Sequence, residues 1–432
     1  MIHAASCECS VGGADLFTTP PTQTATTRRY TIDLHPTGNT ADDSPIELVA
    51  SGPDDDYTAL SLHDLEIKAK IVKKNGDRLI AADKVGLVNF PLHSIWSQVD
   101  VYIGDELVTS ANNNYPYTAV FEKLLTYNKD ALESQFTAEM FAMDTAGHMD
   151  SVVDDNKGLV TRRKYSDLSK TFTLRGSLHV PILRQERFMI NKLGLKIVLI
   201  PHNPKFYLMS EIKDGNEYKL VVESAKLEIV RLKMNPDLLI EHEKELMLKN
   251  ALYPIRRQDV KTFSIPANSM QAVKENLWVG RRPRRIVIAM VKSTAHAGKL
   301  DENPYNFAHY DCNYIAAVSE GLRYPSRALQ PDFEGGNYLD AFQSIYEGTG
   351  IRNDVASLLI DRDAYAKGYT LFVIHLSPGE PDSSTYDLVE NGNVRLEMRF
   401  KKPLPDTVTV IAYGEFQSEI RVTRDRSVLY DF

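Results

Sequence analysis

The chain has 432 residues, 43% of them hydrophobic and 25% charged, which is the balance of a folded protein with room for two domains of about 200 residues. Its formal charge of −8 provides no overall field that would attract a polyanion. This composition argues against a disordered protein and against a protein whose main task is to wrap nucleic acid.

The cysteines and the apolar stretches indicate where the protein folds. Cys7 and Cys9 are too close in sequence to bridge comfortably, and with Cys312 the count is odd, so we expect a reducing compartment and no disulfide framework. The N-terminus lacks the pattern of a signal peptide, and apolar stretches such as residues 286–291 are far too short to span a bilayer. We therefore expect a soluble protein that is made in the cytoplasm and does not insert into membranes.

Residues 1–27 are predicted to form an extended N-terminal arm. Leu16 and Phe17 form a small apolar hook, and Pro20 with Pro21 removes two backbone donors and favours extended, unpaired chain. A frayed terminus is the alternative. We predict that the hook docks on a neighbouring subunit and helps assembly.

Short strands separated by turn residues follow the arm. Residues 58–72 alternate, imperfectly, between apolar and polar side chains, which is typical of a strand. Asn75-Gly76 then predicts a hairpin turn, with a return strand that begins at residues 78–80.

The remaining elements follow in the same style. Residues 99–108 predict a second hairpin, and residues 117–128 a helix with Pro116 in its first turn. Two more helices are predicted at residues 236–250 and 338–346. Further strands are predicted at residues 171–178, 193–200, 218–233, 260–266, 285–291, 369–376, 394–400 and 407–416.

This order of elements predicts the fold class. Runs of strands with little helix between them favour antiparallel sheets and exclude a βαβ arrangement. Two sandwiches of about 200 residues favour jelly rolls with long loops. We predict an all-β chain of two tandem jelly-roll β-sandwiches (a double jelly roll) with short helices in long loops: residues 28–235, a linker helix at 236–250, and residues 251–432.

Segments spread in order over nearly the whole chain resemble one known family. The most specific is Asn112-Asn113-Asn114-Tyr115-Pro116-Tyr117, and Asp144-Thr145-Ala146-Gly147-His148-Met149 and Asn306-Phe307-Ala308-His309-Tyr310-Asp311 are others. The chain resembles the double jelly-roll major capsid proteins of Polinton/Maverick elements and adintoviruses, including uncharacterised relatives in animal genomes. It departs from them at Phe90-Pro91, which interrupts a stretch that is rich in Asn in relatives and puts the local turn in doubt.

The resemblance implies a structural protein of the virion and no enzyme. It implies two upright jelly rolls per chain and a homotrimer with a pseudo-hexagonal outline. Many trimers would tile an icosahedral shell around double-stranded DNA, with a separate single jelly-roll protein at the vertices. The subunits would be made in the cytoplasm and assembled there or in the nucleus, without a cofactor.

Patterns that could carry catalysis or bind a metal are incomplete. His242 lies in a helix between Glu241 and Glu243, but no second histidine follows at the spacing of a zinc site. His3, Cys7 and Cys9 lack a fourth ligand. Cys312 stands beside His309 and Asp311, where we expect a packed cysteine rather than a nucleophile.

The strongest local charge lies in Arg281, Arg282, Arg284 and Arg285. These guanidinium groups always carry their charge and repel one another, so solvent, nucleic-acid phosphates or carboxylates must offset them. We favour a contact with carboxylates of a neighbouring subunit. Two other functions stay open: a carbohydrate-binding, lectin-like β-sandwich, and a β-rich hydrolase whose catalytic residues come from distant loops.

Overall fold

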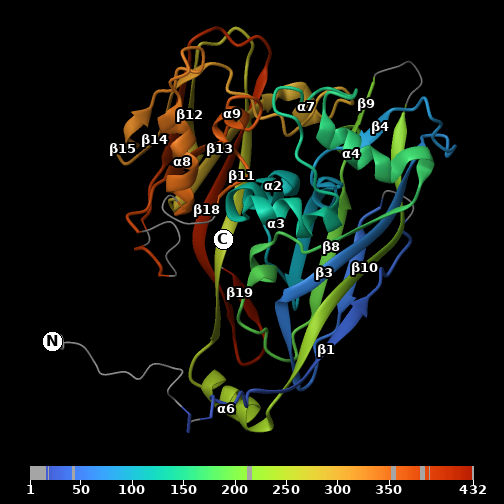
Figure 1. Cartoon of the computed structure of the whole chain (residues 1–432). Coiled ribbons are helices and arrows are strands. Elements are labelled where there is room, and N and C mark those ends of the chain that lie inside the picture. The colour runs from blue at the N-terminus through green and yellow to red at the C-terminus, as the bar shows by residue number, and fades with distance from the viewer. Residues whose placement is uncertain are drawn as a thin grey trace.

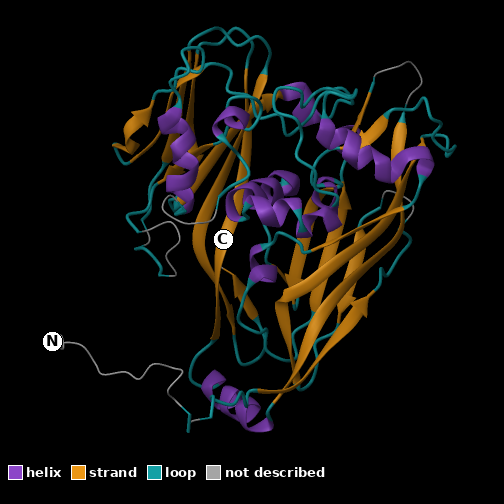
Figure 2. Cartoon of the chain, in the orientation of Figure 1, coloured by secondary structure: helices purple, strands orange, loops and turns teal. Residues whose placement is uncertain are grey.

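A computed structural model describes residues 16–17, 19–40, 44–211, 217–351, 357–379, 385–388 and 390–430. Two β-sandwiches stand side by side, with helices between them and at their ends (Figure 1, Figure 2). No strand ladder of the described residues joins a strand before residue 235 to a strand after residue 250. The all-β prediction of two tandem sandwiches is confirmed.

The first sandwich packs two four-stranded antiparallel sheets. One sheet has the order β1 (Thr26–Leu34), β10 (Tyr218–Met234), β3 (Asp56–Lys73) and β7 (Phe172–Gly176). The other has the order β2 (Ile46–Ala50), β8 (Leu195–Pro201), β5 (Trp96–Ile103) and β6 (Glu106–Leu107). A short pair, β4 (Val85–Leu87) and β9 (Leu208–Ser210), lies beside them.

The second sandwich repeats this plan. Its larger sheet has the order β11 (Ala251–Ile265), β18 (Val408–Val422), β13 (Arg285–Lys292) and β16 (Phe372–His375), with β19 (Val428–Tyr430) paired to β18. Its other sheet has the order β12 (Gln271–Trp278), β17 (Val394–Phe400), β14 (Cys312–Ser319) and β15 (Leu322–Leu329).

Side-chain alternation explains why these segments are strands. In β3, Leu65, Ile67 and Ala69 are fully buried, whereas Lys68 on the opposite face is exposed. This is the period of two of a sheet with one face on the core. Strand β13 is apolar and buried at six successive positions, as expected of a central strand that is covered on both faces.

The predicted helices are present with shifted ends. They are α2 (Tyr115–Thr126), α6 (Pro236–Leu246) and α8 (Leu339–Thr349). The others are α1 (Pro91–Ser94), α3 (Lys129–Glu133), α4 (Lys157–Ser166), α5 (Pro204–Tyr207), α7 (Ser293–Ala297), α9 (Arg362–Tyr365), and the 3₁₀ turns η2 (Gln135–Glu139), η3 (Asp167–Ser169) and η4 (Pro181–Arg184). No helix of the described residues is long and apolar enough to cross a membrane.

The predicted hairpin at Asn75-Gly76 is wrong in its return strand. The chain does turn there, with the Lys73 N–H donating to the Asp77 carbonyl at 3.0 Å. Residues 78–80 then form no strand, and the Ile80 side chain is exposed. Strand β3 pairs with β10 and β7 instead, and these partners are far away in sequence.

Phe90-Pro91 makes a local turn and leaves the fold intact. Phe90 adopts a left-handed conformation with φ 51°, and Pro91 opens the short helix α1. Both side chains are buried, so the core accommodates this local turn.

Candidate functional site

Helix α2 lies at the boundary between the two sandwiches (Figure 1). Its Tyr117 and Phe121 side chains are fully buried. The Tyr117 ring lies 5.8 Å from Phe206 of the first sandwich and 5.9 Å from Tyr305 of the second, and Phe121 lies 5.4 Å from Phe307. Aromatic pairs at these distances stabilise the folded protein by more than the burial of their apolar surface alone would. The most specific sequence segment therefore leads into a helix that joins the two halves.

A buried ion pair lies on the side of α2 toward the first sandwich. Lys123 is fully buried and pairs with Glu139 of η2. His93 donates from Nε2 to the Glu139 carboxylate at 3.2 Å and accepts at Nδ1 from the Tyr115 hydroxyl at 3.0 Å. That hydroxyl in turn accepts from the backbone N–H of His179 at 3.2 Å. Buried charges persist only where they are paired in this way.

The protonation states in this network follow from burial. Burial lowers the pKa of Lys123 to about 8 and that of His93 to about 3, so His93 is neutral at pH 7. Burial alone would raise the pKa of the Glu139 carboxyl, but His93 and Lys123 outweigh it and hold that pKa below its usual range. The network is thus a satisfied Lys–Glu pair with a neutral histidine as hydrogen-bond relay.

A second buried ion pair belongs to the first sandwich and is contacted by the second. The Arg162 and Asp144 side chains are fully buried, with 2.5 Å between Nη2 and Oδ1. Asn303 of the second sandwich donates to the other Asp144 oxygen at 3.0 Å, and the Tyr369 hydroxyl donates to the Asp144 carbonyl at 3.0 Å. Arg162 also donates to the Leu87 carbonyl at 2.8 Å. This cluster fixes the orientation of one jelly roll against the other.

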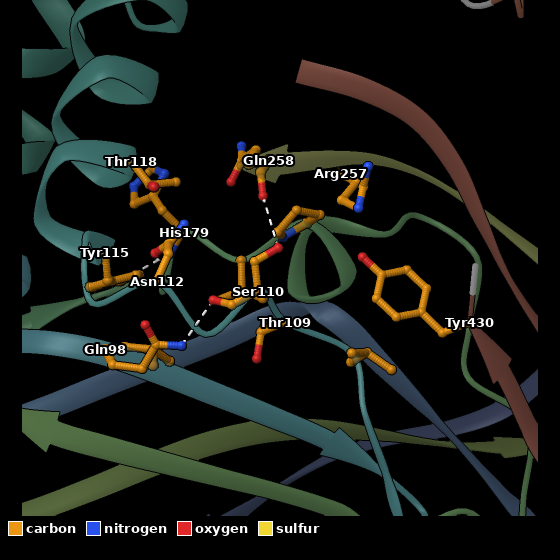
Figure 3. Close-up of a pocket in the computed structure, with 14 residues that line it drawn as sticks. Gln98, Thr109, Ser110, Asn112, Tyr115, Thr118, His179, Arg257, Gln258 and Tyr430 are labelled. Atoms are coloured by element: carbon orange, nitrogen blue, oxygen red, sulfur yellow. Dashed lines mark hydrogen bonds between the residues drawn. The ribbon is translucent and has the colours of Figure 1, made fainter. Parts of the chain in front are cut away.

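A cavity of about 40 Å³ lies at the same boundary (Figure 3). Gln98 donates to the Ser110 carbonyl at 2.9 Å, and the Ser110 hydroxyl donates to the Gln258 carbonyl at 3.2 Å, so this chain of contacts crosses from β5 to β11. His179 also lines the cavity, and burial lowers its pKa to about 3. The cavity has room for a few water molecules and is too small for an organic ligand.

The four arginines predicted as a contact segment lie at and before the start of β13, and none is exposed. Arg281 donates to the Gln417 carbonyl at 3.1 Å. The other three pair with carboxylates of the same chain: Arg282 with Glu390, Arg284 with Asp387, and Arg285 with Glu415. Carboxylates of this chain thus offset the charge, and the contact with a second subunit stays a prediction.

The hook residues lie outside both cores. The Leu16 side chain is 77% exposed and that of Phe17 is 96% exposed, and Pro20 and Pro21 are exposed as well. Asn235, which caps α6, holds the arm where it enters β1, because its side chain donates to the Thr24 carbonyl at 3.2 Å. The hook is therefore free of its own sandwich, as a docking segment requires.

Two of the residues that were considered for catalysis or metal binding, Cys312 and His242, lie in surroundings that suit packing rather than chemistry. Cys312 is buried, and burial raises the pKa of its thiol to about 12, which makes it a poor nucleophile. His242 contacts the Tyr57 hydroxyl through Nδ1 at 2.8 Å. Within the described ranges no three His, Cys, Asp or Glu side chains form a group that could hold a metal, and His3, Cys7 and Cys9 lie outside those ranges.

Sequence reasoning missed the buried ion pairs. Lys123 stands among apolar residues of α2, three residues after Val120 and directly before Leu124, and a lysine on an apolar helix face is a detectable sign of a buried partner. Arg162 gave no such sign, because α4 lacks apolar periodicity and was not predicted.

Comparisons with known proteins fit this architecture. The chain matches no family model. It is 26% identical over 350 residues to an uncharacterised protein of Caenorhabditis elegans. The matched residues cover 80% of this chain and 81% of that protein.

Solved structures match the chain along nearly its whole length. A chain of the Sputnik virophage structure superposes with a TM-score of 0.65 at 10% identity, over 99% of this chain and 93% of that one. The Faustovirus major capsid protein superposes with a TM-score of 0.56 at 7% identity, over 94% of this chain and 92% of that one. The mavirus major capsid protein superposes with a TM-score of 0.52 at 11% identity, over 100% of this chain and 96% of that one. The fold of this chain is thus the double jelly roll that the mavirus and Faustovirus major capsid proteins also have.

Proposed function

We propose that this chain is the major capsid protein of a double-stranded DNA virus or virus-like element of the Polinton/Maverick and adintovirus type. The observation that carries the proposal is the extent of the structural likeness. Both jelly rolls, and not one alone, superpose on the mavirus major capsid protein over the full chain. A lectin or hydrolase built on a single jelly roll would match one half only.

The boundary between the jelly rolls supports a role as a rigid subunit of a shell, which we call a tile. The aromatic contacts of α2 and the Asp144–Arg162 cluster bury polar and apolar groups from both halves. Interfaces of this kind resist the domain motion that is usual between loosely joined domains. We propose that the tile assembles into homotrimers and then into an icosahedral shell of the virion. DNA would be enclosed rather than bound, and a single jelly-roll protein would occupy the vertices.

The purified protein is expected to be a stable trimer. Light scattering should give three times the mass of the 48.7 kDa chain, because an obligate capsomer interface buries more than about 2,000 Å² per contact. Negative-stain images should show three-lobed particles. A monomer that persists at micromolar concentration would contradict the proposal.

Deleting the first 24 residues is expected to leave folded trimers and to impair shell assembly. Among the described residues of the arm, the deletion removes the hydrogen bonds of Gln23 with Thr26 and of Thr24 with Asn235, while Leu16, Phe17, Pro20 and Pro21 are exposed, so it takes little from the core. The sharper variant is Leu16→Ser with Phe17→Ser, which removes the apolar hook and keeps the chain length. Trimer mass and shell yield are measured side by side. A variant that fails to fold would show that the arm belongs to the core.

A further inference from the structure

A mostly apolar pocket of about 460 Å³ lies at the C-terminal end of α6, beside the start of β11. The buried side chains of Ile190 and Leu246 line it, together with the half-buried Ala251 and the exposed Lys249. The pocket is open to solvent, and we call it the α6 pocket. Figure 1 shows α6 at one end of the molecule, where the chain passes from the first sandwich to the second.

Exposed apolar side chains flank the α6 pocket. Leu248 is 82% exposed, Met247 is 61% exposed and Leu252 is 43% exposed, and all three lie in or directly after the run of residues that ends α6 and lines the pocket. Apolar surface that gathers in one place on a soluble protein marks a site for another protein segment. The α6 pocket thus has the character of a docking surface.

The N-terminal arm leaves the body of the protein at the other end of the same helix. The backbone N–H of Asn235 donates to the Ala25 carbonyl at 2.9 Å, and its side chain donates to the Thr24 carbonyl at 3.2 Å. Helix α6 has 11 residues and is therefore about 17 Å long. The seven residues from Thr24 back to Phe17 span at most about 25 Å when extended. Hook and pocket thus lie at the same end of each chain, and the arm is long enough to reach an adjoining chain.

We propose that the Leu16-Phe17 hook of one copy docks in the α6 pocket of a neighbouring copy. Phe17 is 96% exposed, so the pocket of its own chain does not cover it. The pocket volume lies in the range of about 300–1,000 Å³ that holds small ligands, and a leucine with a phenylalanine side chain is of that size. Because every copy offers one hook and one pocket, head-to-tail exchange around a ring satisfies them all. This inference rests on the proposed capsid function, since it needs a second copy, and it names the surface that receives the arm.

Chemical cross-linking of the full chain tests the proposal. Thr19→Cys, which keeps the hook, is combined with Lys249→Cys at the pocket, and both positions are exposed. Cys7→Ser and Cys9→Ser remove the other thiols of the arm, and Cys312 is buried. A short bismaleimide reagent should then give covalently linked dimers and trimers on a denaturing gel. Each new cysteine alone should give only background linkage.

Removal of the apolar hook should abolish the links. Leu16→Ser with Phe17→Ser, added to the two-cysteine chain, should lower the linked fraction by about tenfold or more, because burial of each large apolar side chain strengthens binding by about ten- to a hundredfold. These positions are exposed, so the variant keeps its fold. Ala251→Glu places a charge in the pocket and should have the same effect. Ala272→Glu is its matched control, because Ala272 is also a half-buried strand alanine but does not line the pocket.

Light scattering on the same samples separates the possible failures. Links within single chains only, or no links in a sample that is trimeric, would overturn the docking of the hook and leave the capsid proposal standing. Links that survive the loss of Leu16 and Phe17, or that fall equally in the Ala251 and Ala272 variants, would overturn it as well. A chain that stays monomeric and unlinked would overturn both proposals.

Discussion

Arg162→Met is expected to lower the free energy of unfolding by about 3–5 kcal/mol, the usual cost of removing one partner of a buried ion pair. The substitution leaves the Asp144 carboxylate fully buried without its cation. It also removes a donor to the Leu87 carbonyl, so a second buried acceptor loses its partner. Urea unfolding of the purified protein, followed by circular dichroism, measures the change.

Arg175→Met is the matched control for that variant. Arg175 also pairs with carboxylates, Asp64 and Glu228 among them, but its side chain is 42% exposed on the outer face of a sheet. Exposed pairs contribute about 0–1 kcal/mol, so this variant should be nearly neutral. Adding Asp144→Asn to Arg162→Met should restore part of the lost stability, since it removes the unpaired charge. Equal costs for the two methionine variants would mean that the buried pair does not stabilise the boundary.

The sequence predicted only part of the sheets, because some strands carry a clear pattern and others do not: β12, β14 and β15, three of the four strands of one sheet, were not predicted. Residues 394–400 were predicted as a strand and form β17 with the same bounds. The prediction of a return strand at residues 78–80 was wrong, because the alternation of apolar and polar residues does not reveal which neighbour a strand pairs with. Strand β3 pairs with β10, whose residues follow about 150 positions later.

The contacts at the boundary between the two sandwiches could not be predicted from the sequence. Asp144 and Asn303 are 159 residues apart, and no local pattern links two such polar residues. Four arginines that line one cavity between the two jelly rolls show the same limit. Arg284 and Arg285 were found as a basic run, whereas Arg184 and Arg256 stand elsewhere in the chain and join them only in the fold.

Acid is expected to destabilise the protein through buried neutral histidines, and His63 is the clearest case. Its Nδ1 donates to the Leu60 carbonyl at 2.7 Å and its Nε2 accepts from the Leu178 N–H at 2.8 Å. A proton on Nε2 would face that N–H directly, and burial lowers the His63 pKa to about 4 from its ordinary value of 6.5. Burial likewise lowers the pKa of His202 to about 4 and that of His179 to about 3.

The sign and size of the effect follow from proton linkage. The unfolded chain binds a proton at His63 below pH 6.5, and the folded chain does so only near pH 4. The stability is therefore complete above pH 6.5 and falls as the pH drops toward 4, by about 2.5 kcal/mol from His63 alone between pH 7.5 and 4.5. His63→Gln should be less stable at pH 7.5 and should lose less further stability on acidification, whereas the exposed His148→Gln should retain the parent's pH dependence. Urea midpoints at the two pH values measure this. An unchanged pH dependence in His63→Gln would mean that His63 already binds its proton in the folded chain, and that its two hydrogen bonds do not hold it neutral.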